Sequence, residues 1–290
     1  MLRSVSTAGS FRARIAAGKL LCAPILLALV PSFGIGAQTL NSDRLPPTGT
    51  PAAGSLFLGP QSRRDYDRPV SWKLVAPNIF SDQKAIWLFP TKLAENHNWI
   101  PALSVAGVTA GLLTLDPYEG RYFHATSTFQ GFNRVFTGNA TVLGAIAIPV
   151  SLYVAGLARS DTKMQHTALL AGEAVADAEI LTTVLKDIDR RARPVVFTPH
   201  GNYWDSWFDD QGATLRGNGS FPSGHAIAAF AIATVIAHRY RRHRWAPYVA
   251  YGVATVVGFS RLSLSAHFSS DVFVGAVLGY SISRFAVLRY

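Results

Sequence analysis

Six apolar segments constrain the fold of this chain more than any other feature of its sequence. They span residues 98–115, 140–158, 167–185, 225–239, 246–260 and 271–287, and they are rich in Ala, Leu, Val and Gly. None shows the strict apolar–polar alternation of a half-buried strand, so each segment predicts a helix. Consecutive helices of this kind bury their apolar faces against one another. We therefore predict an all-α fold built as a six-helix bundle.

Composition and segment length favour a bundle that is embedded in a membrane. Charged residues make up only 15% of the chain, against about 25% in soluble domains. A membrane span needs about 20 apolar residues; segment 140–158 reaches that length, whereas segments 225–239 and 246–260 are shorter. Segment 167–185 carries Glu173, Asp177 and Glu179, so one side of it must face protein or water. An exported soluble bundle is the alternative.

The first hundred residues divide into three parts that differ in composition. Residues 1–37 combine a basic head with the apolar run "LLCAPILLALVPSFGIGA", and they predict a signal peptide or an uncleaved N-terminal anchor. Residues 38–78 are rich in Pro and Gly and predict a flexible segment. Residues 79–97 mix aromatic and charged side chains, as expected for an amphipathic helix at an interface or packed on the bundle. We expect residues 98–290 to form the helical domain.

Basic residues gather at one end of the predicted bundle. The stretch "HRYRRHR" (238–244) joins two apolar segments, and Arg159, Lys163, Arg284 and Arg289 fall at the same end if the helices alternate in direction. Such a position favours a flank on the cytoplasmic side of a membrane over a nucleic-acid site. An exported N-terminus followed by six crossings would place this end outside, so the topology stays open.

Three polar motifs occupy the opposite ends of the apolar segments. They read "KDIDRRARP" (186–194), "PSGH" (222–225) and "SRLSLSAHFSSD" (260–271). If the helices run alternately up and down, all three meet at one end of the bundle. We therefore expect the active site at that end.

The types of residue in these motifs suit a tetrahedral phosphate dianion. Lys186, Arg193 and Arg261 supply positive charge, and arginine can bind phosphate oxygens in pairs. Ser223 and Gly224 stand where a helix begins, so their backbone N–H groups are expected to be open to an anion. Arg191 is a further candidate ligand of the phosphate.

Two histidines and an aspartate complete the predicted chemistry. His267 and Asp271 are four residues apart, which places them on one face if both are helical. A carboxylate on one ring nitrogen would leave the other as a nucleophile. His225 would protonate the leaving alcohol and later activate water. Because cations stabilise the charge, the reaction needs no metal and no cofactor.

The three motifs resemble the signature of the type 2 phosphatidic acid phosphatases. The pattern is Lys-x6-Arg-Pro, Pro-Ser-Gly-His and Ser-Arg-x5-His-x3-Asp, and the resemblance covers about residues 170–288. It is shared with bacterial class A acid phosphatases and vanadium haloperoxidases. It implies that Lys186, Arg193, Ser223, Gly224 and Arg261 bind phosphate, while His225, His267 and Asp271 are catalytic.

This resemblance implies a phosphatase that forms a phosphohistidine. Its substrate would be a phosphomonoester or a lipid (pyro)phosphate. From the apolar helices and the placement of the basic residues, we expect the protein in a bacterial-type inner membrane, with the active site facing the extracytoplasmic side; an exported soluble form is the alternative. Vanadate would act as a phosphate mimic. A vanadate-dependent haloperoxidase and a membrane protein without enzymatic activity are the two alternatives.

Overall fold

The computed structural model describes residues 68–93, 99–198, 200–208 and 218–289. The chain divides into two units, residues 1–67 and 68–290, and every described residue belongs to the second unit. The predicted signal peptide or anchor over 1–37, and residues 38–67 of the predicted flexible segment, lie outside the described residues. Every regular element within the described ranges is helical, so the all-α prediction is confirmed.

Each of the six predicted segments forms a helix, and most helix ends fall within a few residues of the predicted ones. The largest difference is at the first helix, which continues ten residues past 115 because its polar residues are paired inside the bundle. Two short elements, α5 (Gln130–Val135) and the 3-10 turn η1 (Pro194–Val196), were not predicted. The six main helices are α4 (Trp99–Ala125), α6 (Gly138–Ala158), α7 (Thr162–Asp189), α8 (Gly224–Arg239), α9 (Ala246–Ser263) and α10 (Ser269–Ser281), the last continuing as the π-helical η2 (Ile282–Val287).

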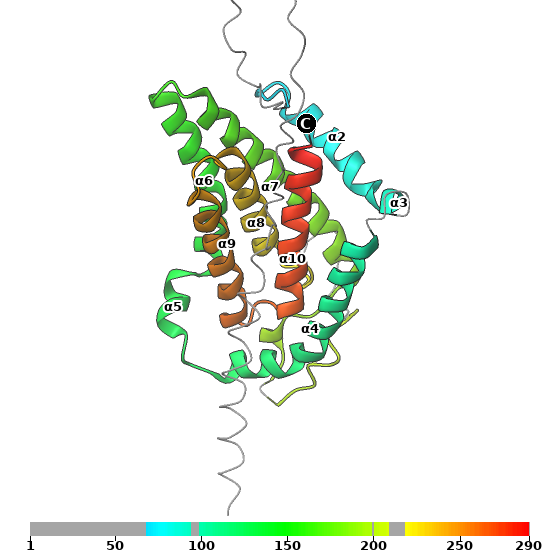
Figure 1. Ribbon diagram of the computed structural model, residues 1–290. Helices are drawn as coiled ribbons and strands as arrows, with labels where there is room; N and C mark the ends of the chain where they lie inside the picture. Colours follow the sequence, from blue (N-terminus) through cyan, green and yellow to red (C-terminus); the bar gives the residue numbers. More distant parts are fainter. Residues whose placement is uncertain (1–67, 94–98, 199, 209–217, 290) are drawn as a thin grey trace, which may run out of the picture. The chain divides into compact units, whose positions relative to one another are not determined.

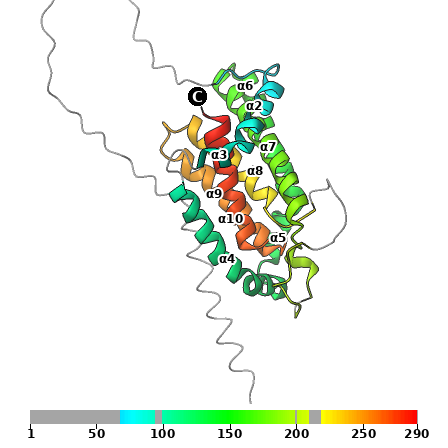
Figure 2. The same cartoon turned by 90° about the vertical axis from the view of Figure 1, so that its right-hand side faces the viewer.

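Helix α8 lies at the centre of the bundle. It contacts α7, α9 and α10 along their lengths, while α6 packs on α7 and α8, and α4 packs on α10 (Figures 1 and 2). Its small side chains allow this close packing, since Ala226 and Ala231 are fully buried. The main apolar core joins α7 to α8 and the C-terminal segment, and its buried members are Leu170, Ala171, Ala174, Ala178, Leu181, Ile227, Ala231, Ile232, Val235, Ile282, Val287 and Leu288.

Two glycines let α10 approach the backbone of α8. A Cβ atom placed on Gly275 would lie 2.8 Å from the carbonyl oxygen of Ser223, and one on Gly279 would collide with the carbonyl of Ile227. Small residues four apart on one helix face allow this kind of backbone contact. The start of α8 is therefore held directly against the first turns of α10.

Helix α2 (Val75–Trp87) and the short α3 (Phe89–Leu93) replace the single helix predicted over 79–97. Helix α2 begins within the predicted flexible segment and packs on α7 and η2. Its buried Asp82 pairs with Arg68 at 2.6 Å, and Arg68 also reaches Glu173 of α7 at 3.2 Å. Gln83 donates to the Asp177 carboxylate at 2.9 Å. The acids of α7 thus anchor α2 on the bundle.

Three described helices are long and apolar enough to cross a membrane. They are α4 with 27 residues, α6 with 21, and α10 continued by η2 with 19. Helix α6 has almost no buried side chains, and Leu143 and Val154 are 65% and 57% exposed. An apolar surface of this extent is unusual on a soluble monomer. Such a surface suits a bundle surrounded by lipid.

Candidate active site

The structure brings the three polar motifs together at one end of the bundle. The backbone N–H of Ser223, before α8, donates to the carbonyl of Asp271 in α10 at 3.0 Å. The N–H of His267 donates to the carbonyl of Arg261 at 3.3 Å, and the N–H of Ser220 donates to that of Arg191 at 2.7 Å. These backbone bonds connect the ends of α7 and α9 to the starts of α8 and α10.

The first turn of α8 presents an unpaired hydroxyl and backbone donors. Ser223 is the N-cap residue, but its side chain does not cap the helix, and its buried Oγ has no hydrogen-bond partner among the described residues. The N–H groups of Gly224, His225 and Ala226 have no carbonyl partner within the helix. The expectation for the Ser223 N–H was wrong, because Asp271 occupies it. The hydroxyl and the next N–H groups form a surface of hydrogen-bond donors whose chemistry suits an anion.

Lys186 and Gly224 face each other across the start of α8. A Cβ atom on Gly224 would lie 3.8 Å from the Lys186 Nζ, so the glycine leaves the ammonium group and the helix terminus open to the same ligand. Lys186 lies near the end of α7, outside the three candidate membrane spans. Burial, and then repulsion by Arg193, lowers the pKa of its ammonium to about 8.

The two arginines are held by carbonyl groups rather than by carboxylates. Arg193 Nε donates to the carbonyl of Asn218 at 3.3 Å, and Arg261 Nη2 donates to that of Phe136 at 2.6 Å. Burial lowers the pKa of Arg261 to about 10, and repulsion by Arg193 adds to the shift. Within the described part of the chain, neither arginine forms an ion pair with a carboxylate, and crowded cations of this kind create a positive potential that favours an anion.

His267 is oriented by a backbone carbonyl. Its Nδ1 lies 2.6 Å from the carbonyl oxygen of Ser220, which can only accept a hydrogen bond, so Nδ1 carries the proton and Nε2 keeps its lone pair. Burial lowers the pKa of His267 to about 4. His267 precedes α10 instead of lying on it, so the shared helix face expected for His267 and Asp271 does not form. Asp271 Oδ2 is 3.8 Å from Nδ1.

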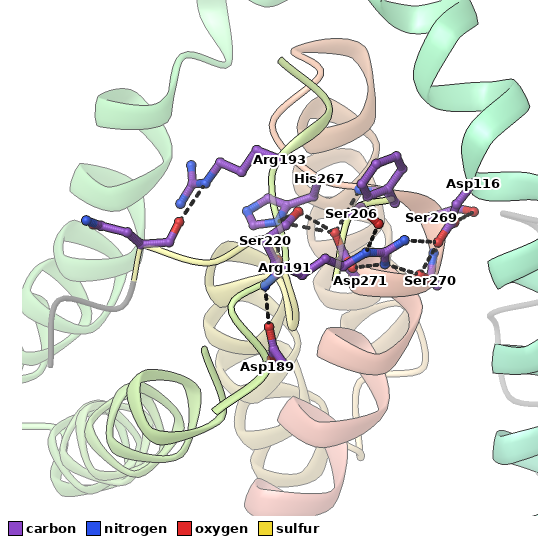
Figure 3. A network of polar contacts seen from close by, with 12 residues as sticks. Asp116, Asp189, Arg191, Arg193, Ser206, Ser220, His267, Ser269, Ser270 and Asp271 are labelled. Atoms are coloured by element: carbon purple, nitrogen blue, oxygen red, sulfur yellow. Dashed lines mark hydrogen bonds and ion pairs between the residues drawn. The ribbon is translucent and has the colours of Figure 1, made fainter. Parts of the chain in front are cut away.

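The Asp271 carboxylate is nevertheless fixed behind the imidazole. It accepts hydrogen bonds from the Ser220 hydroxyl at 2.6 Å and from the Phe268 N–H at 2.9 Å. It also pairs with Arg191 Nη1 at 2.5 Å (Figure 3). This pairing directs the guanidinium of Arg191 toward α10, away from the role of phosphate ligand that the sequence suggested.

His225 stands in the first turn of α8, half-buried. Its Nε2 lies 3.3 Å from the carbonyl of Gly138, at the start of α6. Burial, followed by the charges of Arg261 and His267, lowers the pKa of His225 to about 3. Both histidines are therefore neutral at pH 7 in the protein without a bound anion.

A mostly apolar groove leads away from this end of the bundle. Its volume is about 1100 Å³, and it runs between α6, α8 and α9. Lys186, Gly224 and His225 line its polar end, Ala229 lines its apolar length, and Arg159 and Trp245 line the opposite end. Its position gives an apolar chain access to the site. Among the described residues, no group of three His, Cys, Asp or Glu could hold a metal ion.

The aromatic residues of the loop after η1 serve different roles. Tyr203 is buried and its hydroxyl lies 2.9 Å from His124 Nδ1, so it packs the loop against α4. Trp207 stacks on the Arg191 guanidinium. Trp204 and Phe208 are exposed, as expected for side chains that contact a membrane interface.

Sequence reasoning missed three residues around the site. Ser220 provides both the carbonyl for His267 and the hydroxyl for Asp271, and its position two residues before "PSGH" gave no signal. Asp116 and Glu119 of α4 bind the first residues of α10. Two acids within a helix apolar enough to span a membrane are a signal of function, and that signal could have found them.

Comparisons with known proteins give a family match and two individual similar proteins. Residues 167–290 match the PAP2 superfamily. A lipid A 1-phosphatase of Porphyromonas gingivalis is 43% identical over 66 residues, which cover 22% of this chain and 15% of that protein. A transmembrane PAP2 type phosphatidylglycerolphosphate phosphatase of Bacillus subtilis, known from a crystal structure, is 18% identical with a TM-score of 0.37, covering 71% of this chain and 94% of that one.

Proposed function

Because residues 167–290 match the PAP2 superfamily, we propose that this chain is a metal-independent phosphatase that hydrolyses a phosphorylated lipid through a phosphohistidine at His267. The observation that carries this proposal is the hydrogen bond from His267 Nδ1 to the carbonyl of Ser220. It leaves the Nε2 lone pair available as a nucleophile.

The reaction proceeds in two steps. His267 Nε2 attacks phosphorus and forms a P–N bond, while the P–O bond to the leaving alcohol breaks and His225 gives that oxygen a proton. Water then attacks phosphorus, His225 takes a proton from it, and the P–N bond breaks to release inorganic phosphate. The Asp271 carboxylate, 3.8 Å from Nδ1, stabilises the positive charge on the phosphorylated ring.

Binding of substrate prepares His225 for the role of acid. Its pKa is low because of burial and the nearby charge of Arg261. A phosphate dianion between Lys186, Arg261 and the start of α8 would offset this positive charge. The pKa of His225 would then rise, because a nearby negative charge stabilises the protonated ring. The Ser223 hydroxyl and the first N–H groups of α8 would bind phosphate oxygens.

The groove supports a lipid as the substrate. It begins at Lys186 and His225 and continues between apolar side chains, so an acyl chain fits it while the phosphate rests on the cations. The matched relative from Porphyromonas gingivalis is named for a lipid phosphatase activity, although the matched segment spans only 15% of that protein. The basic residues at the opposite end support an active site that faces the extracytoplasmic side.

Phosphate release by the purified full-length protein in detergent tests this function. The substrates are phosphatidic acid, phosphatidylglycerol phosphate, undecaprenyl pyrophosphate and p-nitrophenyl phosphate, each with and without a chelator. We expect release from at least one lipid, insensitivity to the chelator, inhibition by vanadate, and no turnover by His267→Ala. Phosphate release by a folded His267→Ala protein would refute the mechanism, and no release from any substrate would refute the function.

A bulky side chain in the groove tests the preference for lipids. Ala229 lines the groove, whereas Ala147 is exposed on α6 and does not line it. We expect Ala229→Phe to lower kcat/KM for phosphatidic acid by about tenfold or more, with little effect on p-nitrophenyl phosphate. The matched Ala147→Phe variant should leave both substrates unaffected. Equal losses for both substrates in Ala229→Phe would contradict a lipid-binding groove.

A further inference from the structure

Three charged side chains connect α4 to the candidate nucleophile. Arg191 Nη2 pairs with Asp116 of α4 at 2.6 Å, and Arg191 Nη1 pairs with Asp271 at 2.5 Å (Figure 3). Their side chains are at most 2% exposed. Asp271 lies directly behind His267. Two successive ion pairs, Asp116–Arg191 and Arg191–Asp271, therefore connect α4 to the carboxylate beside the imidazole.

The surroundings of Arg191 hold its guanidinium in one orientation. Phe268 and Trp207 contact it, with ring centres 4.2 and 4.4 Å from its Cζ atom. Its Nε donates to the Ser206 hydroxyl at 3.3 Å, and its Nη1 donates to the Ser270 hydroxyl at 2.8 Å. A guanidinium engaged on this many sides has its donors committed to the protein rather than to a ligand.

The acids of α4 also hold the start of α10. Asp116 accepts from the Ser270 N–H at 3.1 Å and from the Ser270 hydroxyl at 2.5 Å. Glu119 accepts from the Ser269 N–H. Carboxylates at a helix N-terminus bind the unpaired N–H groups and favour its positive end. Asp116 therefore positions both the helix that carries Asp271 and the arginine that pairs with it.

We propose that Asp116 and Arg191 are positioning residues for phosphoryl transfer, because they set the place and the effective charge of the Asp271 carboxylate behind His267. This inference rests on the proposed function. It gives α4 a role in the reaction, although this helix precedes the segment matched to the superfamily. Neither residue touches the phosphate in this arrangement.

The pairing predicts opposite effects on the protonation of His267. Arg191 neutralises part of the Asp271 charge, so its removal leaves a stronger anion beside the imidazole and favours the protonated ring. Asp116 neutralises part of the Arg191 charge, so its removal favours the neutral ring. Both variants leave the other charged or titratable groups around His267 unchanged. These groups are Lys186 and Asp189 of α7, Arg193 after α7, His225 of α8, Arg261 of α9 and Glu119 of α4.

Selective 15N-histidine NMR of the full-length protein in micelles measures this protonation directly. The His267 signal is identified by its loss in His267→Asn. We expect Arg191→Gln to raise the midpoint of its titration and Asp116→Asn to lower it, each by roughly half a pH unit or more. An altered fold alone would not move the midpoint in opposite directions. Shifts of the same sign, or no shift, would overturn the inference.

Kinetics separate a positioning role from phosphate binding. Lysine keeps the charge of Arg191, but it lacks the planar guanidinium that pairs with both acids at once. Arg191→Lys should therefore lower kcat about tenfold or more. It should leave KM and inhibition by inorganic phosphate unchanged. The matched control is Arg190→Gln, which changes the exposed neighbouring arginine and should leave kcat unchanged. A rise in KM with weaker phosphate inhibition would make Arg191 a phosphate ligand and overturn the inference.

The two proposals fail in distinguishable ways. If the wild-type protein releases no phosphate, the proposed function fails, while the NMR titration still tests the charge relation. If the wild-type protein is active and Arg191→Lys has unchanged kcat, the positioning role fails alone. Should Arg191→Gln not fold, because two buried acids lose their partner, Asp116→Asn and Arg191→Lys still decide the outcome, with folding checked by circular dichroism.

Discussion

The backbone N–H of Ser223 donates to the carbonyl oxygen of Asp271 at 3.0 Å. This bond joins the residue before α8 to the first turn of α10. Ser223 belongs to the surface that would bind phosphate, and Asp271 would support the proposed nucleophile, His267. The distance between a bound anion and His267 would therefore be set by how closely the two helices pack.

Gly275→Ala should disturb this packing. The added Cβ would lie 2.8 Å from the Ser223 carbonyl oxygen, so α10 must move away from α8. We expect a loss of stability of about 1–3 kcal/mol together with a lower kcat, measured by thermal unfolding in detergent and by phosphate release. Gly252→Ala in α9 is the control, since a Cβ there meets nothing within 4 Å. Unchanged kcat in Gly275→Ala would contradict this coupling.

Ser223→Ala should affect stability and activity in opposite directions. The buried hydroxyl has no partner among the described residues, so its removal should leave stability unchanged or slightly higher. Loss of a phosphate contact should raise KM and the inhibition constant for inorganic phosphate by about tenfold. Ser283→Ala is the control, because that buried hydroxyl donates to the Ala231 carbonyl at 2.9 Å and lies outside the site. Ser283→Ala should lose stability and keep KM.

His225→Asn should distinguish good from poor leaving groups. A general acid contributes about 10²–10⁴-fold to rate, and an alkoxide from a lipid needs its proton far more than p-nitrophenolate does. With p-nitrophenyl phosphate we expect a burst of about one product per protein and then slow turnover, because water lacks its base. Stopped-flow absorbance measures the burst. Its absence, with equal loss for both substrates, would contradict the assigned role; His200→Asn, an exposed histidine, is the control.

The buried neutral ring of His267 should make stability depend on pH. Burial lowers its pKa from 6.5 to about 4, so between these values the unfolded chain binds a proton that the folded protein does not. Stability from this group is therefore lost as pH falls from about 6.5 to 4, by up to about 1.4 kcal/mol per pH unit. Thermal unfolding across this range should show a flatter dependence in His267→Asn than in wild type. Parallel curves would contradict the burial of a neutral ring.

Much of the architecture follows from local patterns in the sequence. The observed α8, Gly224–Arg239, and α9, Ala246–Ser263, differ from their predicted ranges by at most three residues at any end, because an apolar run and its turn residues set a helix locally. The meeting of the motifs at one end also follows from helix order. The extension of α4 past residue 115 does not, since Asp116 becomes favourable inside a helix only when Arg191 and α10 surround it.

The spacing of the motifs identified Lys186, Ser223, His225 and His267 as candidates, because residue type and separation along the chain are enough to suggest an anion site with two histidines. Packing decided which atom each group faces. The Nδ1 of His267 bonds to the carbonyl of Ser220, 47 residues away, and Arg191 bonds to Asp116, 75 residues away. Partners so distant in sequence meet only when helices pack, so no local pattern encodes them.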